Sequence, residues 1–298
     1  MKTWQILRTT FSESVDDEIL RLSAALSYYA VFSLAPLLLI AVSVAGAVYG
    51  EDAASGVLAR ELTASMGATA AEAVQEMVKN ARQPGDSITA AVVGIAMLLF
   101  GACGVFLQLQ DALNTVWGFA VREGTGIRGM LRDRLLSLSM VFGVGFLLLI
   151  SLGLSTALNV ASDVMSAVAP LHPLVWRVLK SLVSFVVIAL LFGAIFKVLP
   201  DAKIDWNDVW AGALATSLLF ALGEAVLSWY LGRESTSSTY GSAGALSLVL
   251  IWVYYSSIIL LVGAEFTQVL AHARGRIIEP SDRAVRVKPS VAHANLHA

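Results

Sequence analysis

The stretch LSAALSYYAVFSLAPLLLIAVSVAGAVYG, residues 22–50, contains no Asp, Glu, Lys, Arg or His and establishes the class of this protein. A helix of about 20 mainly apolar residues is long enough to cross the hydrocarbon core of a bilayer. This stretch exceeds that length, so it predicts a transmembrane helix. The residues before it include Glu13, Asp16, Asp17 and Glu18 and lack a signal-peptide pattern. We therefore expect the helix to remain as a membrane anchor.

The composition of the whole chain supports a membrane protein. Of its 298 residues, 14% are charged and 57% are hydrophobic, and the mean hydropathy is +0.74. A soluble domain carries about 25% charged residues. The net charge of −2 lacks the basic excess typical of nucleic-acid binders. The single cysteine, Cys103, cannot form an intrachain disulfide.

Apolar runs predict an all-α, polytopic bundle of about six transmembrane helices. The predicted spans cover residues 27–49, 88–110, 135–158, 177–199, 209–231 and 244–267. We expect residues 1–273 to form a single membrane domain. Residues 274–298 are polar and contain Pro280 and Pro289, which predicts a disordered cytoplasmic tail.

The distribution of Lys and Arg predicts the orientation. With these six spans, 14 of the 20 basic residues fall on the side that carries both termini, and 6 fall on the other side. Cytoplasmic loops carry the excess of basic residues in membrane proteins. Both termini are therefore expected in the cytoplasm, which agrees with an even number of spans.

Two segments outside the spans have amphipathic patterns. The N-terminal segment places apolar residues at helical spacing, which predicts a helix lying at the cytoplasmic interface: Trp4, Leu7, Phe11, Val15, Ile19 and Leu22. The external loop, residues 51–86, predicts two short amphipathic helices broken near Gly67. These two helices are expected to cap the bundle on the outside.

Glu224 is the main candidate for a functional residue within a span. Ser217 and Ser228 share its helix face at spacings of seven and four. A charge inside a bilayer costs about 2.5–3.5 kcal/mol on insertion scales. Glu224 is therefore either part of a proton or substrate path, or a structural carboxyl that bonds to a neighbouring helix or reaches water.

Two further groups are candidates for lining such a path. In the first span, Tyr28 and Ser33 lie close to Pro36, which is expected to kink the helix. In the sixth span, Trp252 and Tyr255 lie near mid-membrane, although such residues usually collect at the interfaces. Both groups have two interpretations, the lining of a cavity or ordinary packing.

Polar residues near the cytoplasmic ends of two spans are the remaining candidates. Gln108, Gln110, Asp111 and Asn114 form either a polar cytoplasmic mouth or a solvated helix end, and we favour the second interpretation. Glu265 is expected to pair with a basic residue, since it lies near the cytoplasmic end of the sixth span.

No common catalytic motif occurs in the chain. The patterns GxxxxGK[ST], HExxH and GxSxG are all absent. The four histidines are His172, His272, His293 and His297, and their spacing does not suggest a ligand set. We therefore predict a protein that is not an enzyme and that needs neither a metal nor a cofactor.

Four stretches together resemble the YihY family, also called the virulence factor BrkB family, of bacterial inner-membrane proteins. They are LSAALSYYAVFSLAPLLL (22–39), ALNTVWG (112–118), FKVLPDAKIDWNDVWAGALATSLLF (196–220) and YGSAGALSLVLIWVYYSSIILLVGAEFT (240–267). The resemblance implies a six-span, multi-pass protein of the bacterial inner membrane. Members have been labelled ribonuclease BN, but this sequence shows no basic surface or acidic centre for RNA hydrolysis.

These features favour a transporter or a protein that handles lipids or other amphiphiles through a polar and aromatic intramembrane cavity. The alternative is a scaffold that docks envelope-assembly proteins without transporting anything, and a membrane-bound hydrolase or ribonuclease ranks last. Membrane lipid is the first expected partner. Envelope proteins and a second copy of the chain are further possible partners, and nucleic acid is not expected.

Overall fold

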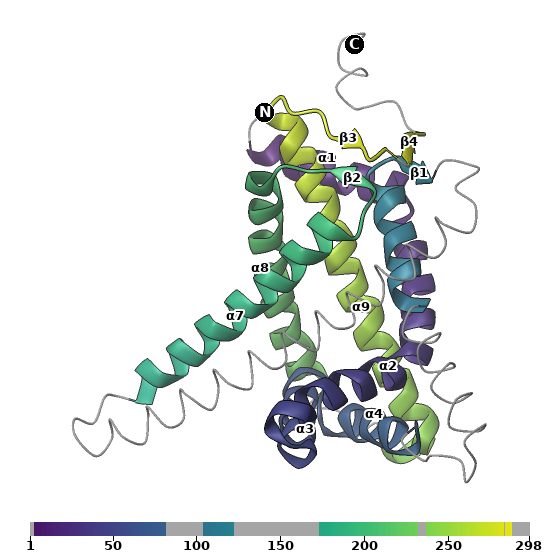
Figure 1. Cartoon of the computed structure of the whole chain (residues 1–298), viewed down its shortest axis with the longest axis vertical. Coiled ribbons are helices and arrows are strands. Elements are labelled where there is room, and N and C mark those ends of the chain that lie inside the picture. The colour runs from purple at the N-terminus through teal and green to yellow at the C-terminus, as the bar shows by residue number, and fades with distance from the viewer. Residues whose placement is uncertain (1–2, 82–103, 122–172, 232–236, 283, 288–298) are drawn as a thin grey trace.

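Long apolar helices dominate the computed structural model, which describes residues 3–81, 104–121, 173–231, 237–282 and 284–287 (Figure 1). Four helices in this part are long and apolar enough to cross a membrane. They are α2 (Ile19–Tyr49), α7 (Pro173–Val198), α8 (Trp206–Leu231) and α9 (Ser237–Ala273). The predicted all-α membrane class is therefore confirmed.

These four helices match the spans predicted at 27–49, 177–199, 209–231 and 244–267. The span predicted at 135–158 lies outside the described residues, and so does most of the one predicted at 88–110. A helix covers residues 104–116 at the end of that second stretch. The total of six spans and the cytoplasmic location of the termini stay predictions.

Helix α9 is the centre of the described bundle. It packs against α2 and α8, while α7 packs against α8 and runs obliquely away from the other helices (Figure 1). Among the side chains described near the start of α7, Val178 and Leu182 are apolar and more than half exposed. Exposed apolar surface is normal where the solvent is hydrocarbon.

The amphipathic segments form helices, but the predicted N-terminal helix ends at Asp16, so Ile19 and Leu22 belong to α2 and are buried there. The amphipathic helices are α1 (Thr3–Asp16), α3 (Glu51–Met66) and α4 (Ala68–Ala81). Gly67 separates α3 from α4 with φ +81°, a left-handed conformation that glycine adopts without steric cost. Helices α3 and α4 lie across the bundle at the end remote from the N-terminus (Figure 1), and they bury Leu58 and Val74 against α2 and α9.

A close contact joins α8 to α9, and we call it the Gly/Thr seam. A Cβ atom on Gly212 would lie 1.7 Å from Thr267 Oγ1, and a Cβ on Gly263 would lie 1.9 Å from Thr216 Oγ1. Each threonine hydroxyl donates to the carbonyl four residues earlier, Thr216 to Gly212 and Thr267 to Gly263. Membrane helices approach most closely at such small residues. The seam is therefore reciprocal, since each helix offers one glycine to the other helix's threonine.

The tail prediction is wrong for residues 274–287, which are ordered in the described structure apart from the undescribed position 283. Strand β4 (Ala284–Arg286) pairs antiparallel with β1 (Phe119–Val121), and β3 (Glu279–Pro280) pairs with β2 (Ala202–Lys203). The strands lie at the end of the bundle that carries the N-terminus (Figure 1). Composition indicated disorder here because it does not reveal pairing with strands far away in the sequence.

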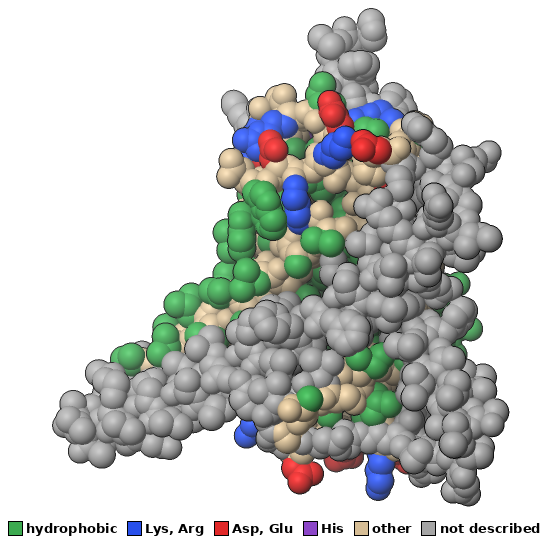
Figure 2. Space-filling model, in the orientation of Figure 1, with side chains coloured by type: hydrophobic (Ala, Val, Ile, Leu, Met, Phe, Trp, Pro, Cys, Tyr) green, Lys and Arg blue, Asp and Glu red, His purple; other side chains and the backbone are tan. Residues whose placement is uncertain are grey.

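The described surface is divided by polarity along the long axis (Figure 2). Charged side chains gather at the two ends, and hydrophobic side chains cover the flank of α7 and α8 between them. Trp206 and Trp210 are exposed at the start of α8, and the Lys197 ammonium lies 5.5 Å from the Trp206 ring centre. Tryptophan beside lysine is typical of a membrane interface.

Candidate functional site

The candidate site is an apolar groove of about 890 Å³ beside α1, which we call the α1 groove. One wall is α1 with the first turn of α2, and the other wall is α8 with α9. The side chains that the argument uses are Leu7, Phe11, Val15, Leu218, Leu219 and Phe266. Pockets with such lining bind apolar molecules, since few polar groups are present to bind anything else.

The α1 wall follows directly from the amphipathic pattern of the N-terminal sequence. Leu7, Phe11 and Val15 recur at intervals of four, which puts them on one helix face. They are 51%, 74% and 62% exposed, so this face is not buried in the protein core. The face instead lines the groove and borders the hydrocarbon or headgroup region.

The α8–α9 wall gives the groove its depth. On α9 the lining runs from Ile258 to Phe266, a separation that corresponds to a rise of about 12 Å along a helix. On α8 it includes Leu218 and Leu219, which are 55% and 45% exposed. Gly263 also lines the groove, so one residue of the Gly/Thr seam borders it.

Charged groups in the lining belong to the α1–α2 junction. Glu18 and Arg21 line the groove and form an ion pair with each other. Their side chains are 57% and 74% exposed, so the pair is solvated and contributes little to stability. The groove therefore has a polar rim beside an apolar interior.

The structure places Glu224, Tyr255 and Trp252 near one another but outside the lining of the α1 groove. The Tyr255 hydroxyl lies 2.2 Å from the position of a Cβ on Gly223, the residue before Glu224. The Trp252 ring meets the Phe220 ring edge to face at 6.3 Å. These aromatic residues therefore pack α9 against α8, and Glu224 is partly buried beside them.

The structure does not describe Ser217 and Ser228 as lining a path with Glu224. The Ser217 hydroxyl is buried and donates to the Ala213 carbonyl at 2.7 Å, within its own helix. Ser228 lies in α8, but its side chain is outside the described ones. A path along this face stays a prediction.

The candidates of the first span point in different directions. Tyr28 is 60% exposed, and its ring contacts Tyr29 and Phe32 of the same helix. Ser33 is buried, with its hydroxyl oxygen 3.4 Å from where a Cβ on Gly104 would lie. Pro36 lies inside α2, which continues to Tyr49. The described contacts therefore bring Ser33 against helix 104–116 and leave Tyr28 on the surface.

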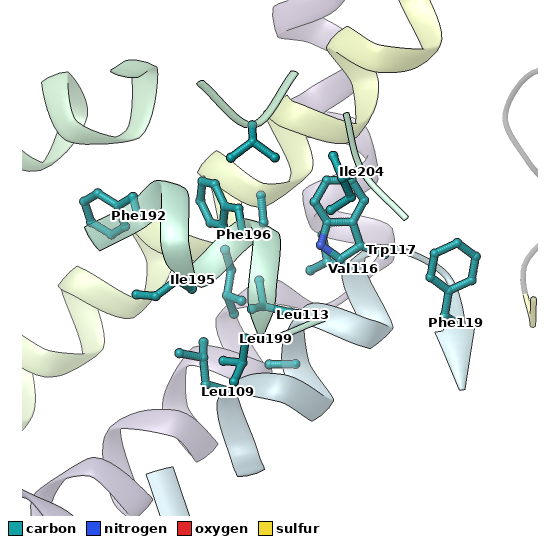
Figure 3. Packing of buried hydrophobic residues seen from close by; sticks show 14 of the residues in the cluster. Leu109, Leu113, Val116, Trp117, Phe119, Phe192, Ile195, Phe196, Leu199 and Ile204 are labelled. Atoms are coloured by element: carbon teal, nitrogen blue, oxygen red, sulfur yellow. The ribbon is translucent and has the colours of Figure 1, made fainter. Parts of the chain in front are cut away.

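A buried polar cluster replaces the predicted solvated helix end. Gln110 and Asn114 donate from their side-chain amides to Asp201 Oδ2 at 3.1 and 3.2 Å, and the Asp201 backbone N–H donates to Asn114 Oδ1. The favoured interpretation is wrong for Gln110 and Asn114, which are 6% and 4% exposed, while Asp111 is exposed and Gln108 partly buried. Residues close to the cluster in the sequence, including Leu113, Trp117 and Leu199, belong to the buried apolar core drawn in Figure 3.

A second ionic contact ties the end of α9 to the start of α8. Asp208 is nearly fully buried and accepts from Arg274 Nη1 at 2.7 Å and Arg276 Nη1 at 2.8 Å. An acid in the first turn of α8 is also favoured by the helix dipole. The spacing of Asp208 in the sequence gave no reason to connect it with residues 66 and 68 positions later.

A third ionic contact, beside strands β2 and β3, joins Lys203 to Asp282 at 2.9 Å. The hydrogen bond and charge of Asp282 raise the pKa of Lys203, and Lys203 lowers the pKa of Asp282. Both side chains are exposed, so solvent screens the interaction. The pair fastens the β2–β3 contact at the surface.

No basic partner of Glu265 lies among the described residues, and the pairing with a basic residue stays a prediction. Glu265 is 1% exposed, and its Oε2 atom has no hydrogen-bond partner in the described part of the chain. The Gln268 amide is placed with its nitrogen toward Glu265 and Val116. In this orientation the nitrogen donates to Glu265 Oε1 at 3.1 Å and to the Val116 carbonyl at 3.0 Å. Glu265 is thus an interior residue that links α9 to helix 104–116.

Among the described residues, no three His, Cys, Asp or Glu side chains are grouped so that they could hold a metal ion. The arrangement that the described residues offer is therefore a binding groove with an apolar interior.

The chain is similar in sequence to several known proteins. A UPF0761 membrane protein of Mannheimia succiniciproducens is 24% identical over 264 residues, which cover 87% of this chain and 86% of that protein. A Bacillus subtilis protein named ribonuclease-like protein YfkH is 25% identical over 279 residues, 91% of this chain and 96% of its own length. A UPF0761 membrane protein of Albidiferax ferrireducens is 30% identical over 173 residues, 57% of this chain but only 39% of that protein.

No solved structure matches the chain. The family model described as virulence factor BrkB matches residues 10–286, which include the second half of α1 and every long apolar helix described above. The seam, the groove and the ordered part of the tail all fall within the match, apart from Leu7 at the edge of the groove. The chain belongs to the virulence factor BrkB family.

Proposed function

We propose that this protein handles a lipid or another membrane amphiphile in the bacterial inner membrane and holds an acyl chain in the α1 groove. The observation that carries the proposal is an apolar groove of about 890 Å³ between the amphipathic helix α1 and the helices α8 and α9, which are long and apolar enough to cross a membrane. A sugar or an ion would need several polar partners, which the lining beyond its rim does not offer.

The position of the groove supports lateral entry from the bilayer. Its apolar residues Phe11, Val15 and Leu218 are more than half exposed, so they face hydrocarbon when the protein is in a membrane. An acyl chain can then enter without crossing water. The Glu18–Arg21 pair at the rim lies where a headgroup would remain hydrated.

Native mass spectrometry of the protein released from nanodiscs tests whether lipid binds there. We expect wild-type protein to retain phospholipid, and Leu218→Trp to retain about tenfold less because the indole fills the groove, a difference of about 1.4 kcal/mol. Leu222→Trp is the matched control, since Leu222 is 58% exposed on α8 but does not line the groove. Equal retention by Leu218→Trp and Leu222→Trp would contradict binding in the groove.

Liposomes that contain labelled lipid test handling beyond binding. We expect wild-type protein to accelerate lipid movement, Leu218→Trp to slow it and Leu222→Trp to leave it unchanged. Glu224→Ala separates the groove from the path predicted along Glu224, which lies outside the groove lining. Retained lipid without any movement would favour the scaffold alternative, with the lipid as a structural ligand.

The name of the Bacillus relative does not change this proposal. The described residues show no grouped acids or histidines for a hydrolytic metal centre. We therefore propose a role that does not depend on catalysis.

A further inference from the structure

The backbone between α1 and α2 has an uncommon conformation at Glu18. Its φ of +52° and ψ of +43° are left-handed, and it is the one non-glycine residue with positive φ among the described residues. In this conformation the Cβ of an L-residue crowds the following carbonyl oxygen. Glycine would occupy the position without that cost.

The left-handed residue turns α1 back onto the bundle. Helical hydrogen bonds continue on both sides of it, from the Glu18 N–H to the Val15 carbonyl and from the Leu22 N–H to the Glu18 carbonyl. As a result α1 packs mainly against α9, with few contacts to α2, and becomes a wall of the groove. A right-handed Glu18 would instead join α1 and α2 into one continuous helix.

We propose that α1 is a lid hinged at Glu18 that controls entry of the acyl chain into the α1 groove. In the docked position Leu7, Phe11 and Val15 form one wall of the groove and narrow its opening to the bilayer. In the extended position these residues leave with α1, so the groove loses this wall and Phe266, which is partly buried when α1 is docked, faces the bilayer. This inference rests on the proposed function, because it assigns a control element to the same groove.

The contacts of the lid suit a reversible element. The Ser14 hydroxyl lines the groove and has no hydrogen-bond partner among the described atoms. The apolar face of α1 is exposed in the docked position, so it is suited to the membrane interface whether docked or extended. The docked and extended positions of α1 therefore differ little in buried apolar surface. The conformation of one backbone residue is then enough to shift the equilibrium between them.

Three substitutions at one residue test the hinge. Glu18→Gly, Glu18→Ala and Glu18→Val all remove the ion pair with Arg21, so they differ in backbone preference and in the size of a small apolar side chain at the rim. Spin labels on Ser12→Cys and Ala221→Cys, in a Cys103→Ser background in nanodiscs, report the distance from α1 to α8. Both labelled positions are exposed and lie outside the groove lining.

We expect the ratio of docked to extended protein to fall in the order Gly, Ala, Val. The Gly-to-Ala step should be roughly fivefold to thirtyfold, which corresponds to the cost of a left-handed L-residue. We also expect bound lipid to exchange more slowly in Glu18→Gly and faster in Glu18→Val. Identical distance distributions in the three variants would overturn the lid.

Native mass spectrometry of the same samples separates the two proposals. If lipid is retained and Leu218→Trp removes it while the distances do not change, the lid is wrong and the groove remains a lipid site. If the distances follow the expected order but no sample retains lipid, the proposed function is wrong and the hinge is supported.

Discussion

Helices α8 and α9 form two very different contacts along their common length. At the Gly/Thr seam, the missing side chains of Gly212 and Gly263 leave room only for a threonine. At the α1 groove, Leu218 and Phe266 line a cavity of about 890 Å³. Small residues let membrane helices close completely, while large apolar residues that face outward leave space for a third element or a lipid.

Adding one methyl group at the seam should have the largest effect on stability. Gly212→Ala puts a Cβ 1.7 Å from Thr267 Oγ1, so the helices must separate. We expect a loss of about 1–3 kcal/mol, as found for overpacking, measured by reversible denaturation in mixed detergent.

Gly56→Ala on α3 is the control for that substitution, because nothing lies within 4 Å of its added Cβ. It should be neutral or stabilising by up to about 1 kcal/mol. If Gly212→Ala and Gly56→Ala behaved alike, the close contact at the seam would be disproved.

Removing the buried acid at the end of the same helix pair should have the next largest effect. Asp208→Ala removes the carboxylate to which Arg274 and Arg276 donate and leaves Arg276 only its longer contact with Asp205. We expect a loss of about 2 kcal/mol, since hydrogen bonds to charged groups contribute about 1.5–3 kcal/mol. Hydrogen exchange of residues 274–287 should also increase. Asp205→Ala is the control, because Asp205 is 73% exposed and lies 3.4 Å from Arg276; an equal loss there would contradict this role of Asp208.

Filling the groove should change lipid content more than stability. Leu218 is 55% exposed, so Leu218→Trp should change the free energy of unfolding by less than about 0.5 kcal/mol. A large loss of stability in a delipidated sample would show that this wall is a packed core and would remove the contrast with the seam.

The smallest effect is expected at the exposed Lys203–Asp282 pair. The lowered pKa of Asp282 means that its contribution is present above the ordinary aspartate pKa and is lost as the pH falls through the lowered value. The raised pKa of Lys203 means that its contribution is present below the ordinary lysine pKa and is lost as the pH rises through the raised value. Melting temperatures of wild type and Asp282→Asn should therefore differ slightly at neutral pH and converge in strong acid. A difference that persisted in strong acid would contradict the pairing.

The sequence predicted the elements that depend on local pattern. Hydropathy located α2, α7, α8 and α9, and amphipathic spacing with Gly67 located α1, α3 and α4. The length of an apolar run and the periodicity of its residues are local properties, so a single sequence is enough to detect them.

The parts that depend on distant residues were not predictable in this way. Asp201 meets Asn114 across 87 positions, and Asp208 meets Arg276 across 68. Glu265 was expected to have a basic partner because an acid usually has one, but its described neighbour is an amide. The i, i+4 spacing shared by Gly212–Thr216 and Gly263–Thr267 was the one available signal for the seam.

Electron cryo-microscopy of the protein in lipid nanodiscs tests the central claim most directly. The account predicts elongated density for an acyl chain between Phe11 of α1 and Leu218 and Phe266 of the opposite wall, and its absence in Leu218→Trp. Side chains packed together across that space in wild-type protein, with ordered lipid visible elsewhere on its surface, would contradict it.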